Sequence, residues 1–206
     1  MPYVSVFYLS VFEVEWQLNL FLSCMLTDSM SSQRYKPVGL VTQFLTEDHR
    51  RLETLLQSAF HSGGRVDHPL YDQFRAGLLR HIGMEEKILL PTVHRLRGGE
   101  PLALAARLRL DHGAIAALLM PTPTDGLIAT LQVILNTHNL IEEGPEGLYE
   151  TCDALAGAES EQLQARLRAV PDLSVLPHAD TPAVLGAVRR ALERAGYGDL
   201  GVSSFL

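Results

Sequence analysis

From Pro37 onward, apolar residues recur every three or four positions, which is the period of an amphipathic helix. Four such stretches predict helices at about 38–61, 69–96, 100–119 and 126–157. Breakers separate them: the triplet SGG at 62–64, the pair GG at 98–99 and the loop PTPTD at 121–125. Pro91 lies inside the second stretch and is expected to kink or split it.

Short connections between the four helices favour antiparallel neighbours. No strand pattern competes between 37 and 157, so the sequence predicts an all-α, up-down-up-down four-helix bundle over 37–157. The remaining residues, 158–206, read as a linker and a C-terminal helical extension. Residues 159–168 extend the helical part, prolines at 171 and 177 make the linker extended, and Thr181 caps a last helix that ends near Gly196.

Residues 1–36 form an atypical apolar segment, rich in aromatics and without Lys or Arg before Arg34. Neither a signal peptide nor a membrane span is indicated, since there is no basic start and Glu13 and Glu15 interrupt the apolar run. Three interpretations stay open. The segment packs on the protein, it lies outside a natural start at Met25 or Met30, or it associates with a membrane surface.

Composition narrows the function classes. The 206 residues are 47% hydrophobic with a formal net charge of −7, enough for about one domain with a sizeable core. This acidic balance argues against binding to nucleic acid or to anionic membranes, which need basic surfaces. Two cysteines, Cys24 and Cys152, give no disulfide framework, and a reducing cytoplasm fits them.

Four histidines fall on the apolar faces, one in each predicted helix. Each lies three, four or seven positions from apolar residues of its stretch, offsets that share one helix face; the four are His49, His81, His112 and His138. Two of them have a glutamate one turn later, His81 with Glu85 and His138 with Glu142. A lone histidine followed by an HxxxE motif therefore occurs twice along the chain.

This doubled pattern indicates a metal pair inside the bundle. Buried carboxylates are costly without a partner, and neighbouring ones repel, whereas imidazoles and carboxylates together hold metal ions such as iron. A metal-free packing role for the histidines is the alternative. Glu86 and Glu143 would point about 100° away on regular helices, although Gly144 and Pro145 could create a bulge that exchanges Glu142 for Glu143 as ligand.

Other polar residues near the predicted site have less defined roles. Glu146 and Tyr149 lie near the face of His138 and are expected either to hydrogen-bond the ligands or to be exposed or packed. Asp111 is expected to be solvated, and Cys152 to be a small core residue.

The chain resembles hemerythrin-like proteins of the HHE cation-binding type. The resemblance covers about 38–157 and rests on the motifs DHRRLETLL at 48–56, LLRHIGMEEKILLP at 78–91, RLRLDHGAIAALL at 107–119 and HNLIEEGPEGLYE at 138–150. It implies a four-helix bundle around two non-haem iron ions, oxo- or hydroxo-bridged. The implied ligands are His49, His81, Glu85, His112, His138 and Glu142, with the two glutamates bridging.

The oxygen-carrying members of that family use five histidines. Here the third helix offers only His112, with Leu108 four positions earlier and Ala116 four later, which argues against reversible oxygen carriage. The resemblance implies iron, oxygen or redox sensing, or iron handling, with a diatomic molecule or peroxide as the small ligand. Two alternatives stay open: a di-iron redox enzyme acting on peroxide or nitric oxide, and a metal-free helical interaction module. No residue is assigned a catalytic role.

Overall fold

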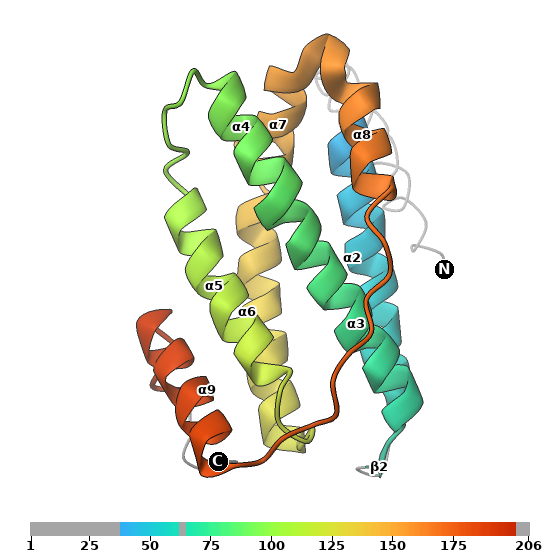
Figure 1. The fold of residues 1–206 in the computed structure, drawn as a ribbon, viewed down its shortest axis with the longest axis vertical. Helices are drawn as coiled ribbons and strands as arrows, with labels where there is room; N and C mark the ends of the chain where they lie inside the picture. Colours follow the sequence, from blue (N-terminus) through green and yellow to red (C-terminus); the bar gives the residue numbers. More distant parts are fainter. Residues whose placement is uncertain (1–37, 62–64, 201–206) are drawn as a thin grey trace, which may run out of the picture. The chain divides into compact units, whose positions relative to one another are not determined.

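The computed structural model describes residues 38–61 and 65–200, and the predictions made for the segment 1–36 lie outside them. The described chain is a helical bundle, which confirms the predicted all-α class (Figure 1). Its elements are α2 (Leu40–Ala59), β1 (Phe60–His61), β2 (Arg65–Val66), α3 (His68–Met84), the π-helical turn η1 (Glu85–Leu89), α4 (Leu90–Leu96), α5 (Ala105–Leu118), α6 (Asp125–Glu143), α7 (Leu148–Ala156), the 3₁₀ turn η2 (Gly157–Glu159), α8 (Ser160–Arg168) and α9 (Pro182–Arg194).

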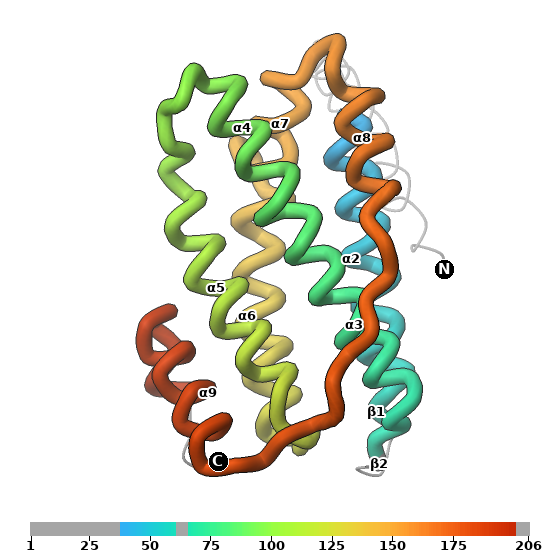
Figure 2. The backbone as a smooth tube through the Cα atoms, viewed as in Figure 1, coloured from blue at the N-terminus to red at the C-terminus, as the bar shows by residue number. Residues whose placement is uncertain are grey.

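The chain reverses direction after α2, after α4 and after α5, so that successive helices run back along one another (Figure 2). The first reversal contains a two-residue antiparallel ladder, in which Phe60 lies opposite Val66. This ladder was not predicted, because two residues on each side of a turn are too few to show an alternating pattern. In the described part of the chain, no helix combines the length and apolarity needed to cross a membrane.

The second predicted helix is interrupted, as the position of Pro91 suggested. The π-helical turn η1 lies directly before Pro91, which stands at the start of α4. Proline has no backbone N–H and its ring displaces the carbonyl one turn earlier, so the preceding turn widens to relieve the clash. The helix axis continues through this turn, but the side chains of residues 85–89 point in other directions around the axis than they would in a regular α-helix.

The predicted continuous helix over 126–157 is wrong. The structure divides it into α6 and α7 at residues 144–147, where Glu146 adopts a positive φ of 59°. Gly147 permits this turn, because a Cβ there would lie 2.5 Å from the carbonyl oxygen of Glu142. Beyond the turn, the Asp153 carboxylate of α7 accepts hydrogen bonds from the backbone of Val41 and Thr42 and so caps α2.

Two apolar clusters form the core, and the four inward histidines lie between them. Along every helix the change of cluster falls at the histidine: Leu45 and Leu52 flank His49 and belong to different clusters, as do Leu108 and Ile115 around His112. Leu78 and Met84 flank His81 in the same way, and on α6 Ile134 and Ile141 flank His138. A buried polar layer therefore crosses the middle of the bundle.

The C-terminal part follows the predicted course. After α8, an extended segment leads to α9, where the Thr181 hydroxyl accepts a hydrogen bond from the backbone N–H of Val184 as the predicted cap. Helix α9 packs against α5 and contributes Val188 and Leu192 to the core. Arg107 of α5 fastens the end of this extension by donating hydrogen bonds to the carbonyl of Ala195 and the hydroxyl of Tyr197.

Candidate metal centre

The six predicted site residues meet in the polar layer. His49 comes from α2, His81 from α3, His112 from α5 and His138 from α6, and each is at most 6% exposed. Glu85 of η1 and Glu142 of α6 lie one turn after His81 and His138 and are completely buried. The helical spacing of the sequence therefore brought these side chains together, as predicted.

The six residues form two four-membered groups that share both glutamates. One group, which we call cluster A, contains His49, His81, Glu85 and Glu142; the other, cluster B, contains Glu85, His112, His138 and Glu142. Within each cluster the potential ligand atoms all lie within 4.8 Å of one another. Glu85 and Glu142 each approach histidines of both clusters, so both glutamates are placed between two potential metal positions.

The short distances involve the Nε2 atoms of the histidines. His81 Nε2 lies 3.2 Å from Glu85 Oε1, and His138 Nε2 lies 3.2 Å from Glu142 Oε1. Across the helices, His112 Nε2 lies 3.1 Å from Glu85 Oε2. His49 Nε2 lies 3.5 Å from Glu142 Oε2. The Nε2 atoms therefore all face the shared carboxylates, which leaves the Nδ1 atoms for other partners.

Each Nδ1 atom faces a further carboxylate. Glu143 Oε1 lies 2.6 Å from His49 Nδ1, and Glu86 Oε1 lies 2.7 Å from His112 Nδ1. Carboxylates that accept from the outer nitrogen of a metal-binding histidine fix its tautomer and orientation. Glu86 and Glu143 adjoin the two shared glutamates in sequence, but they serve histidines of the opposite half of the chain.

The remaining two histidines face aspartates. Asp48 Oδ2 lies 2.9 Å from His81 Nδ1. Asp111 Oδ2 lies 3.7 Å from His138 Nδ1, which is longer than a hydrogen bond. The expectation that Asp111 is solvated is wrong, because it is fully buried and also binds Arg107. Asp48 was not singled out from the sequence. An aspartate directly precedes both lone histidines, His49 and His112, and this repetition would have marked it.

Tyr149 of α7 adds a hydroxyl to cluster A. Its Oη lies 2.6 Å from Glu85 Oε1 and 3.0 Å from Glu142 Oε2, to which the hydroxyl can donate. The same oxygen lies 3.1 Å from His49 Nε2 and 3.2 Å from His81 Nε2. The turn at 144–147 places this side chain, and of the two roles left open for Tyr149 the structure supports contact with the site residues. Glu146, in contrast, lies exposed in the turn.

Burial and neighbouring charges shift the pKa values of the site residues in opposite directions. Burial lowers the pKa of His81, but the charge of Glu85 and hydrogen bonds to Asp48 and Glu85 outweigh it and raise the pKa to about 10. Similar contacts overcome burial at the two histidines of cluster B, raising the pKa of His112 to about 11 and that of His138 to about 9. Burial raises the pKa of Glu85, yet its histidines hold that pKa well below the usual range.

The donor set fits metal ions. Several buried atoms directed into cluster B lie close to polar neighbours without forming a well-oriented hydrogen bond, namely Glu85 Oε2, Glu142 Oε1 and His112 Nε2. Such atoms cost free energy unless something else satisfies them, and a cation bound to carboxylate and imidazole does so. Imidazole together with carboxylate suits iron, zinc, copper, nickel or manganese, while the absence of a thiolate from both clusters makes a soft-metal site a poorer fit.

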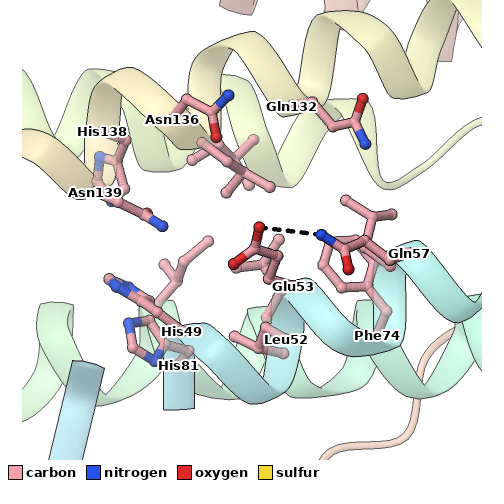
Figure 3. A pocket seen from close by; sticks show the side chains of 15 residues that line it. His49, Leu52, Glu53, Gln57, Phe74, His81, Gln132, Asn136, His138 and Asn139 are labelled. Atoms are coloured by element: carbon pink, nitrogen blue, oxygen red, sulfur yellow. Dashed lines mark hydrogen bonds between the residues drawn. The ribbon is translucent and has the colours of Figure 1, made fainter. Parts of the chain in front are cut away.

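A pocket of about 340 Å³ adjoins the centre between α2 and α6 (Figure 3). Its inner end is formed by the imidazoles of His49, His81 and His138, so it reaches both clusters. Its apolar wall consists of Leu52, Leu56, Phe74, Leu78, Ile82, Ile115 and Leu135. Its polar residues are Glu53, Gln57, Gln132, Asn136 and Asn139, which Figure 3 shows on the two facing helices.

Comparison with known proteins identifies the family. The family model of the hemerythrin HHE cation binding domain matches residues 40–152, which is more than half of the chain and includes both clusters. No curated protein and no solved structure matches the sequence significantly. The chain belongs to the hemerythrin HHE cation-binding family.

Proposed function

We propose that the chain is a non-haem di-iron protein that senses iron, oxygen or redox state. Two iron ions held side by side supply one-electron redox chemistry and coordination positions that small molecules can exchange. The observation that carries this proposal is the sharing of Glu85 and Glu142 between clusters A and B. Two separate mononuclear sites would not need both carboxylates between them.

The protein residues have distinct tasks in this proposal. His49 and His81 would hold one ion and His112 and His138 the other, with the two glutamates bridging. Asp48, Glu86 and Glu143 accept from the Nδ1 atoms and keep the Nε2 atoms directed inward. Of the four histidines, the Tyr149 hydroxyl approaches only the two of cluster A, so the two iron positions would be chemically unequal.

A sensing role is favoured by the contacts of Arg107. This guanidinium binds Asp111, which faces His138, and also the carbonyl of Ala195 and the hydroxyl of Tyr197 at the end of the C-terminal extension. A change at cluster B therefore has a short chain of polar contacts to α9.

Metal analysis and optical spectroscopy of anaerobically purified protein, before and after exposure to air, test the iron assignment. We expect about two irons per chain and new charge-transfer bands after oxidation. The variant His112→Ala should lose iron from cluster B, whereas Glu47→Gln, on the exposed face of α2, should keep both. A chain that takes up no iron after reconstitution would refute the proposal and favour a metal-free helical module.

Limited proteolysis with and without iron tests the sensing role. Cleavage within residues 182–196 should differ between the two forms, because Arg107 joins this segment to the neighbourhood of His138. Identical cleavage patterns at full iron occupancy would remove sensing through α9 and leave iron handling.

A further inference from the structure

The outward face of α6 carries no charge over most of its length. Between Asp125 and Glu142 the sequence contains no Asp, Glu, Lys or Arg. The exposed residues of this stretch, which we call the uncharged face, are Ala129, Gln132, Val133, Asn136, Thr137 and Leu140. Helix α2, of similar length, exposes charged residues along its course, among them Glu47, Arg50 and Glu53. Depletion of charged residues distinguishes the centre of a protein–protein contact from the rest of a surface.

The two largest apolar side chains of the uncharged face are open to solvent. Leu140 is 74% exposed and Val133 is 46% exposed. They lie seven residues apart, which is two helical turns, so both stand on one line along the helix. Between them, the Thr137 hydroxyl donates to the carbonyl oxygen of Val133 in its own helix. The line therefore offers accessible apolar surface with no charged group beside it.

The spacing of these residues fits a second copy of the same face. With antiparallel α6 helices and a two-fold axis between positions 136 and 137, Val133 of one copy lies opposite Leu140 of the other, and this contact occurs twice. The same axis places Ala129 opposite Gly144. Two small residues at that point leave room for a close approach of the helices.

Charge also favours this occupant. Each copy has a formal net charge of −7, so two copies repel across most of their surfaces, and an uncharged face lets them approach without opposing like charges. Glu143, at the end of the face, is already paired with His49 and Arg50. A strongly charged partner would find no counter-charge on the face itself.

The size of the face sets the strength of the contact. A helix rises about 1.5 Å per residue and is about 10 Å wide, so the uncharged stretch offers an area of a few hundred Å². A stable interface of standard size buries about 800 Å² on each partner. The face therefore supports weak, reversible association, with a dissociation constant of about 100 μM rather than in the nanomolar range.

We propose that the uncharged face of α6 is a two-fold contact through which two copies of the chain associate weakly, with their α6 helices antiparallel. Val133 and Leu140 form the centre of the contact. The inward side of the same helix carries His138 and Glu142, so the contact and the candidate metal centre share one element. The association itself does not depend on metal binding.

Sedimentation velocity of the full-length chain, from about 10 μM to about 500 μM, tests the association. We expect it to tighten or stay unchanged when NaCl is raised, because salt screens the repulsion between two acidic chains. Leu140→Glu should weaken it at least about tenfold, since the change occurs twice in the contact. Leu176→Glu adds the same charge at a leucine that is 81% exposed outside α6 and should have no effect.

An exchange of charges tests the antiparallel pairing. Val133→Glu and Leu140→Lys should each weaken the association, because each places a charge opposite an apolar side chain. Combined, they place a carboxylate opposite an ammonium group twice and should restore the association to within about threefold of its original strength. Thermal melting verifies that every variant folds.

The outcomes are separate from those that test the proposed function. A chain that stays monomeric over this concentration range would overturn the proposal, as would a dimer that Leu140→Glu does not weaken. Weakening by salt would overturn the uncharged nature of the contact. A dimer that the combined variant fails to restore would overturn the antiparallel pairing. None of these results depends on iron content, so a chain that binds no iron would refute the di-iron proposal alone.

Discussion

The aspartate behind His81 offers the sharpest test of the carboxylates that surround the clusters. In Asp48→Asn, His81 keeps its position on α3 but loses a charged acceptor 2.9 Å from its Nδ1 atom. Removing such an outer partner typically weakens metal affinity 10- to 100-fold. That range corresponds to about 1.4–2.7 kcal/mol.

The related variant Asp111→Asn should have the smaller effect. Asp111 lies 3.7 Å from His138 Nδ1, beyond hydrogen-bonding distance, and its oxygens are bound by Arg107. We therefore expect a loss of less than about tenfold at cluster B, below the range for a directly bonded partner. The structure thus predicts an order of effects between two aspartates that occupy equivalent places in the sequence.

Chelator-competition titration of the two metal-binding steps measures these losses, with thermal melting as the check of folding. Asp48 also binds the half-exposed Arg51, so Arg51→Gln serves as the control that removes this pair and keeps the contact of Asp48 with His81. That control should leave both metal-binding steps unchanged. The reasoning is refuted when Arg51→Gln reproduces the loss, or when Asp111→Asn proves more harmful than Asp48→Asn.

Three further predictions follow from individual contacts. Tyr149→Phe keeps the ring but removes the hydroxyl 2.6 Å from Glu85, so the metal-free chain should lose about 1.5–3 kcal/mol and melt about 3–12 °C lower in calorimetry; an unchanged melting temperature would contradict the contact. Gly147→Ala should destabilise by about 2 kcal/mol or more in denaturant unfolding, since a Cβ would collide with carbonyl oxygens, whereas Gly113→Ala has free space on α5 and should be neutral or stabilising. At pH 7, metal binding should release about three protons per chain, because the pKa values of three histidines lie between about 9 and 11 without metal; calorimetry in buffers of different ionisation enthalpy measures the number, and no release would contradict it.

The same pKa values set how the stability of the metal-free chain depends on pH. A histidine whose folded pKa is raised contributes stability that is fully present below its unfolded value near 6.5 and is lost as pH rises through the folded value. For His81, His112 and His138 that loss extends up to pH 9–11. Metal affinity changes in the opposite sense, since protons compete with the metal and affinity rises with pH.

Much of the site could be predicted because its main residues obey one local rule. His49 lies four residues after Leu45 and three before Leu52, so its direction into the core follows from the helix period alone. The same holds for the stacked pair His138 and Glu142. These relations need no knowledge of which helices are neighbours.

The partners of the site residues could not be assigned from the sequence, because these contacts join distant segments. Glu86 reaches His112 from a π-helical turn whose angular position a regular helix does not give. Asp48 reaches His81 on the next helix, which depends on how α2 and α3 are set against each other. Tyr149 depends on the turn at 144–147, where the sequence suggested only a bulge within a continuous helix and not a turn that ends it.

The crossing of partners between the two halves of the chain has a consequence for how the centre is assembled. His49 of the first half depends on Glu143 of the second, and His112 of the second depends on Glu86 of the first. Both clusters also need both shared glutamates, one from each half. In the proposed di-metal centre, neither half could therefore mature alone, and occupation of the first position would fix the carboxylates for the second. Metal uptake is expected to be cooperative and to follow completion of the whole bundle rather than to accompany its synthesis helix by helix.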